Sequence, residues 1–311
     1  SKGFHVAFKQ SLYALETIIA NIDDLEKILQ PDCLFGILCL LQRFNGAYKL
    51  KRKTGEHVLR EDQFFITYVE YSMSLYTIVN SINKLLNSSP SSPQMIESIL
   101  MFLAPFENYL KILIDECSFS FDDLLGKQPH VDRVSYMNPL HTLLGILLTF
   151  FPIGEVKDMI GNDDLLMVVT EEPMITLSLH AQASVGLWVR NGLSVVHQLQ
   201  FYKDQLRSSA YLIDIYFNQL QLMLSPEKGI CSFLHKWGFL AGDKQSFLTY
   251  NEIFDDKNNI LLLNMISNLY LILSERNRFS PTSIDAKREE ELFRANVVYF
   301  LLDPPVKYSQ L

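Results

Sequence analysis

Apolar residues recur with a helical period along this sequence, and that period constrains the fold more than any other feature. Near the start of the chain the apolar positions are three or four residues apart: Phe8, Leu12, Leu15, Ile19 and Ile22. This spacing places them on one face of an α-helix. Residues 64–86 and 95–114 repeat the pattern. We therefore expect each of these segments to be an amphipathic helix that packs against a shared core.

The rest of the sequence continues this pattern and shows few signs of strands. Further helices are expected near residues 137–151, 174–204, 208–223, 228–237, 259–274 and 285–302. Breaks are expected at VTEEP (169–173) and LSPEKG (224–229). One short β-hairpin near residues 50–59 is a candidate, with Thr54-Gly55 as its turn. Because no repeat of roughly 34 or 40 residues is evident, we expect an all-α, irregular multi-helix scaffold rather than a regular solenoid.

The composition is that of a folded protein, and the helices divide into two groups. Hydrophobic residues make up 48% of the chain and charged residues 20%, which is typical of globular proteins. The stretch GKQPHVDR (126–133) separates an N-terminal helical subdomain, residues 1–125, from a C-terminal one, residues 134–302. The longest uncharged stretch, residues 134–154, is interrupted by prolines. Its continuous apolar part is too short to span a membrane, so we expect no membrane association.

The charge of the chain bears on its partners. The net charge is −8, which argues against nucleic-acid binding because such binding usually needs a basic domain. One cationic patch stands out in this acidic chain: Lys49, Lys51, Arg52, Lys53 and Arg60. It is either a solvated loop or a docking surface for an acidic partner, because a local cluster of charge can still steer association.

Sequence motifs for catalysis and for metal or cofactor binding do not occur. The glycine-rich phosphate-binding patterns, the HExxH zinc motif and the GxSxG nucleophile motif are all missing from the chain. Its cysteines do not pair at the spacing of a zinc site. They are Cys33, Cys39, Cys117 and Cys231. We therefore expect no catalytic, cofactor-binding or metal-binding residue in this chain.

The segment AQASVGLWVRNGLSVVHQLQFYKD (181–204) carries Arg190, Asn191 and Gly192 in the middle of an apolar helical stretch. A glycine inside a helix costs roughly 1 kcal/mol relative to alanine. On a helix Gly192 would lie within the apolar stripe, where the missing side chain lets another backbone approach closely. The segment is therefore either a helix-packing notch or a ligand or partner contact through Arg190 and Asn191.

This segment also resembles the UBR-box E3 ubiquitin ligases, the N-recognins. Their helix of the form Gln-x-x-x-x-x-Trp-x-Arg-Asn-Gly is matched here by five residues: Gln182, Trp188, Arg190, Asn191 and Gly192. Two more stretches resemble the family in the same order, VSYMNPLHTLLGILL (134–148) and KREEELFRANVVYFLLDPPVKYSQL (287–311). The stretch KLKRKTGEHV (49–58) is most like the fungal branch.

The resemblance implies a scaffold segment of a RING-type E3 ubiquitin ligase of the N-degron pathway. The segment would position the substrate-reading and RING modules for ubiquitin transfer to substrate lysines. Those zinc-binding modules need dense Cys and His clusters and would lie outside this chain, so no catalytic residue is carried over. The implied partners of the whole ligase are a ubiquitin-conjugating enzyme, ubiquitin and N-degron substrates. Its implied location is the cytoplasm, with the nucleus as an additional location.

The same resemblance makes residues 303–311 the start of a truncated winged-helix domain. Because the chain begins with Ser1 and ends inside this motif, we expect it to be a piece of a longer protein. A hypothesis from a different class is also open. The chain would then be an independent helical adaptor that binds a partner peptide or an internal degron in a groove between helices.

Overall fold

The computed structural model describes the helical body of the protein. The described residues are 2–22, 27–28, 30–42, 62–88, 138–151, 153–160, 163–185, 200–205, 210–237 and 256–274. All regular elements in these residues are helices, so the predicted all-α class is confirmed. The hairpin candidate, the helices predicted near 95–114 and 285–302, the boundary at 126–133 and residues 303–311 lie outside the described part and stay predictions.

The α-helices of the described part follow in chain order. They are α1 (Lys2–Ala20), α3 (Pro31–Gln42), α4 (Asp62–Ser88), α7 (Pro139–Leu148), α8 (Ile153–Ile160), α9 (Asp163–Ser184), α11 (Leu212–Leu224), α12 (Pro226–Lys236) and α14 (Asp256–Ser274). Between α9 and α11 lies a short π-helix, η2 (Phe201–Gln205).

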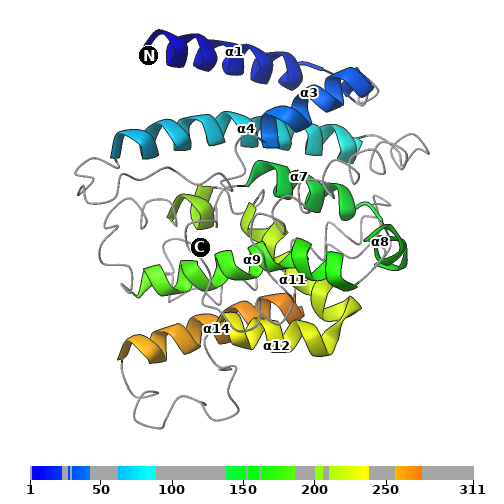
Figure 1. Ribbon diagram of the computed structural model, residues 1–311, viewed down its shortest axis with the longest axis vertical. Coiled ribbons are helices and arrows are strands. Elements are labelled where there is room, and N and C mark those ends of the chain that lie inside the picture. The colour runs from blue at the N-terminus through cyan, green and yellow to red at the C-terminus, as the bar shows by residue number, and fades with distance from the viewer. Residues whose placement is uncertain are drawn as a thin grey trace, which may run out of the picture.

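The helices stack in layers along the longest axis of the molecule (Figure 1). At one end α1 packs on α4, and α4 packs on α7. α7 contacts α11, which in turn contacts α9, α12 and α14. α12 and α14 lie at the end opposite to α1 (Figure 1). α11 therefore connects the two ends of the stack.

α7 shows how the local sequence starts a helix in the middle of the core. The Asn138 side chain accepts a hydrogen bond from the backbone N–H of His141 at 3.2 Å. Pro139 occupies the first turn, where its missing N–H would have no helical partner anyway. Every residue of α7 is buried, so the helix predicted near residues 137–151 lies in the core. Within the described ranges no helix combines the length and the apolar content that a membrane span needs.

Two hydrophobic cores meet at α11. The first contains side chains of α1, α4, α7 and α8, and α11 contributes Ile213, Phe217 and Leu220 to it. The second contains side chains of α9, α12 and α14, together with Ile215 of α11 and its N-cap residue Tyr211. Residues four apart lie on one face of a helix, whereas Tyr211 and Ile215 fall on the face opposite to Ile213 and Phe217. α11 is thus buried on both sides.

The structure corrects the prediction for the segment before residue 185. α9 begins at Asp163 and continues through Pro173 to Ser184, so the break predicted at 169–173 is wrong. A proline inside a helix costs about 3 kcal/mol. The buried residues Thr170 and Met174 flank Pro173, and α9 packs along α11, so tertiary contacts offset this cost. The helices α3 and α8 were not predicted. α3 shows no helical period because it has no polar residue between Cys33 and Leu41, and α8 spans only eight residues.

Candidate functional site

The residues that the sequence singled out for a site lie outside the described part of the chain. This holds for Trp188, Arg190, Asn191 and Gly192. It also holds for the cationic patch, which comprises Lys49, Lys51, Arg52, Lys53 and Arg60. Their roles as a packing notch or as partner contacts stay predictions. Of the motif shared with the N-recognins, Gln182 is described, and its side-chain amide donates a hydrogen bond to Ser178 Oγ at 3.2 Å.

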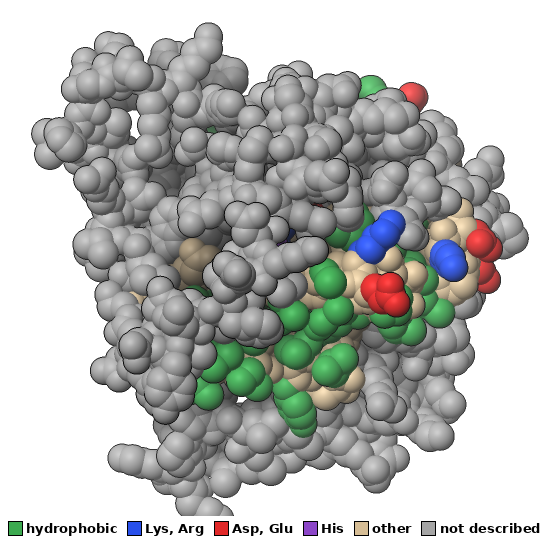
Figure 2. All heavy atoms as spheres, turned by 60° about the horizontal axis from the view of Figure 1, so that its bottom comes forward, with side chains coloured by type: hydrophobic (Ala, Val, Ile, Leu, Met, Phe, Trp, Pro, Cys, Tyr) green, Lys and Arg blue, Asp and Glu red, His purple; other side chains and the backbone are tan. Residues whose placement is uncertain are grey.

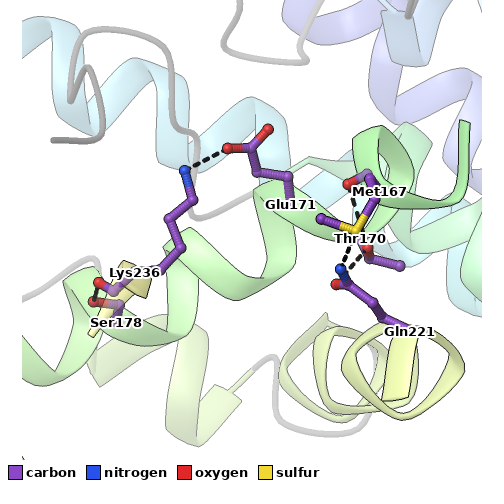
Figure 3. Close-up of polar contacts among 6 residues, drawn as sticks. All are labelled: Met167, Thr170, Glu171, Ser178, Gln221 and Lys236. Atoms are coloured by element: carbon purple, nitrogen blue, oxygen red, sulfur yellow. Dashed lines mark hydrogen bonds and ion pairs between the residues drawn. The ribbon is translucent and has the colours of Figure 1, made fainter. Parts of the chain in front are cut away.

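An ion pair joins α9 to α12. Lys236 Nζ lies 2.5 Å from Glu171 Oε1, and the two side chains are only 4% and 16% exposed (Figure 3). Seven residues further along α9, Ser178 Oγ donates a hydrogen bond to the backbone oxygen of Lys236 at 2.7 Å. Removing one partner from such a buried pair leaves an uncompensated charge, so the pair is costly to break. We call this group the α9–α12 clamp.

A second polar contact joins α9 to α11. Thr170 Oγ1 donates to Gln221 Oε1 at 2.6 Å, and the amide nitrogen of Gln221 donates to the sulfur of Met167 (Figure 3). All three residues are buried. Because buried polar groups cost free energy unless they are paired, these bonds favour one register of α9 against α11.

Buried polar groups are also paired where η2 and α14 meet α11. Tyr202 donates a hydrogen bond to Asp214, and Tyr211 donates to Asn268 Oδ1 at 3.1 Å. Burial is the largest cause that raises the pKa of Tyr202 well above its ordinary value, and the Asp214 carboxylate raises it further. Tyr202 therefore stays neutral and remains a donor over the physiological pH range. These bonds connect the π-helix and α14 to the central helix.

The ionisable side chains of the described residues lie in several separate places, and one group of them, Asp214, Tyr211 and Tyr76, lies around Tyr202. In this part of the chain no group of three or more His, Cys, Asp and Glu side chains could hold a metal ion. His141 stacks edge-on against Phe217, with ring centroids 4.4 Å apart. His235 lies on another helix, where burial and then Lys236 lower its pKa. The described cysteines form no disulfide bonds, and Cys231 is exposed.

A different kind of feature lies on the outer side of α14. Five large hydrophobic side chains there are between 48% and 63% exposed: Ile260, Leu263, Ile266, Tyr270 and Leu273. We call them the α14 stripe. Figure 2 shows the molecule from the end where α12 and α14 lie. Hydrophobic side chains gather on this face, and a few charged side chains lie to one side of them. The sequence predicted this helix but not its uncovered face, although the lack of charged residues between 258 and 274 was a usable signal.

Comparison with known proteins places this helical body in a family. Residues 34–264 match the model of the UBR1/2/3-like ARM repeat domain. The whole chain is 31% identical to E3 ubiquitin-protein ligase UBR1 of Saccharomyces cerevisiae and covers 16% of that protein. It is 22% identical to UBR1 of Homo sapiens over 89% of the chain, again covering 16% of the relative.

A third relative, the ubr1 ligase of Schizosaccharomyces pombe, is 24% identical over 75% of the chain, which covers 12% of it. The chain thus spans a small part of the length of the relatives that it matches. The family model covers most of the chain, and the identity to the budding-yeast relative extends over all of it. The chain therefore belongs to the UBR family of E3 ubiquitin ligases, in which it is an ARM repeat region most like that of the fungal branch.

Proposed function

We propose that this region is a scaffold of a RING-type E3 ubiquitin ligase of the N-degron pathway. It would hold the substrate-reading and RING modules at a working distance, so that ubiquitin reaches substrate lysines. It would speed up ubiquitin transfer by orienting the reactants. Modules that are already held in place lose less translational and rotational entropy when they reach the transition state.

The observation that supports this role is the continuous packing along the stack. α11 contributes to both hydrophobic cores, and buried hydrogen bonds and the α9–α12 clamp add directional contacts between helices. Such joined layers resist bending, because packed cores do not deform continuously. A rigid body of this kind can fix the distance between modules at its two ends.

The partners and cofactors of the proposed ligase follow from its family. Relatives named E3 ubiquitin-protein ligases support a ubiquitin-conjugating enzyme and ubiquitin as partners of the whole protein. N-degron substrates, zinc in the UBR-box and RING modules, and a cytoplasmic or nuclear location belong to the same proposal. The ubiquitin-transfer chemistry would take place on those modules and not on this helical body.

The experiment uses the full-length ligase with Gly145→Ala, which perturbs the contact between α7 and α11. Gly36→Ala is the matched control, because a Cβ at Gly36 meets nothing within 4 Å. Three rates or affinities are compared: ubiquitin transfer to an N-degron substrate, binding of the N-degron peptide, and discharge of the ubiquitin-charged conjugating enzyme to free lysine.

A scaffold predicts a severalfold slower transfer to substrate with Gly145→Ala, while peptide affinity and discharge to lysine stay unchanged. Weaker peptide binding would instead assign substrate recognition to this region. Unchanged transfer, in a variant whose melting temperature is lowered, would refute a positioning role.

A second candidate is a helical adaptor that binds a partner peptide or an internal degron. The exposed α14 stripe is the observation that favours it, since uncovered apolar surface often marks an interaction site. Titration of labelled internal-degron substrates into the full-length ligase tests it. Saturable binding that is lost with Leu263→Asp would support the adaptor, and binding that is indifferent to this change would count against it.

A further inference from the structure

α14 is apolar on both of its sides. Met265 and Ile272 lie in the core between α14 and its neighbours, and Asn268 on the same side accepts the hydrogen bond from Tyr211. The α14 stripe occupies the opposite side, since its members follow one another at steps of three or four residues. A helix that is hydrophobic all round is normally buried on all sides. In the described structure only one side of α14 is covered.

The outer helix at the opposite end of the stack is different. α1 exposes Val6, Tyr13 and Ile18, but the polar residues Gln10, Ser11 and Thr17 are exposed as well. Repeat proteins bury each layer against the next, and their terminal layers carry polar outer faces to stay soluble. The apolar outer face of α14 is therefore typical of an internal layer.

The chemistry of the α14 stripe restricts what can cover it. No charged residue occurs between positions 258 and 274, so an ionic partner would find no counter-charge among the residues of α14 that carry the stripe. The matching surface must be apolar, and a second helix can fit side chains between those of α14 at the usual spacing. Such a helix can come from the same polypeptide. An ARM repeat region is built of stacked helices, and this chain covers only 16% of its yeast relative.

We propose that an apolar helix from a further layer of the same ligase polypeptide packs on the α14 stripe. This layer continues the packing by which α14 already contacts α9 and α11. The contact buries α14 on its second side and extends the helical stack. It forms whether or not the region also positions other modules.

The test is photo-crosslinking in the full-length ligase, with benzoylphenylalanine in place of Ile266. Glu227, an exposed residue on the neighbouring helix α12, is the control position for the same probe. The expected product is a cross-link within one polypeptide, mapped by mass spectrometry to a segment outside these 311 residues, which the control position does not give. This readout is independent of ubiquitin transfer, so it can fail or succeed separately from the scaffold proposal.

Other products would overturn the proposal. A cross-link between two copies of the ligase would make the stripe a dimer interface, and a cross-link to a separate protein or peptide would make it an adaptor surface. If no cross-link forms, the face is open to solvent. As a second measurement, Leu263→Asp combined with the Ile266 probe should lower the yield by about tenfold, because docking would bury a carboxylate. An unchanged yield would refute docking on this face.

Discussion

Gly145 offers the sharpest test of how the stack is held together. It lies in α7, and a Cβ at this position would collide with Ile213 Cγ2 and come within 2.7 Å of Phe217 Cε2. Both neighbours belong to α11 and are fully buried. Ile213 is β-branched and therefore stiff at χ1 in a helix, while Phe217 is held against the His141 ring. Neither side chain can move aside without disturbing the core.

We expect Gly145→Ala to destabilise the region although alanine is the better helix former. Overpacking a core typically costs about 1–3 kcal/mol, and alanine regains up to about 1 kcal/mol of helix propensity. The clash with two rigid side chains places the expected overpacking cost at the upper end, for a net loss of about 2 kcal/mol. For a region of 311 residues, that lowers the melting temperature by roughly 3 °C.

The assay is thermal unfolding of the 311-residue region followed by circular dichroism, with Gly36→Ala as the control. Gly36 lies in the middle of α3, and a Cβ there would meet nothing within 4 Å, so the same substitution should stabilise by roughly 0.5–1 kcal/mol. Ile213→Ala should also cost less in the Gly145→Ala background than alone, because it removes one clashing methyl group. A Gly145→Ala variant as stable as the parent protein would refute the close packing of α7 on α11.

Three further changes test the polar contacts. Lys236→Met should cost roughly 3 kcal/mol in urea unfolding by stranding Glu171, and combining it with Glu171→Met should recover most of that loss. Asn138→Ala should cost about 1 kcal/mol in the same assay, because it removes the cap of α7. Burial raises the pKa of Tyr202 in the folded state, so the stability that it contributes is complete below about pH 10 and falls as the pH rises further. Urea unfolding between about pH 9 and pH 11 should therefore show a shallower alkaline loss for Tyr202→Phe than for the parent.

The helices that could be predicted are those whose period is local. α1, α4 and α14 show apolar residues at three- and four-residue steps over several turns. α4 and α14 lie within three residues of their predicted spans, whereas α1 begins at Lys2, six residues before the first predicted apolar position. α9 could not be bounded in this way, because the contacts that carry it through Pro173 come from α11. The ARM repeat assignment was missed as well, since the family model matches without a repeat that is visible in the spacing of this sequence.

The polar contacts were beyond sequence reasoning for a related reason. Thr170 and Gln221 are 51 positions apart, and Glu171 and Lys236 are 65 apart. Each looks like an ordinary surface residue until the fold brings its partner close. The same holds for glycines: the sequence argued for a packing notch at Gly192, which lies outside the described part, while the structure shows such a notch at Gly145. Whether a glycine in a helix allows close packing or only adds flexibility depends on what the neighbouring helix places beside it.

α11 explains why a change in one layer should be felt throughout the stack. Its Ile213 and Phe217 face the core shared with α7, whereas Tyr211 and Ile215 face the core shared with α14. A shift of α11 away from α7 therefore moves side chains in the second core at the same time. Because packed cores resist continuous deformation, such a shift must be transmitted to α14 or absorbed by local unfolding. Hydrogen exchange distinguishes the two outcomes, since Gly145→Ala should lower protection in α14 as well as in α7 if the stack behaves as one body.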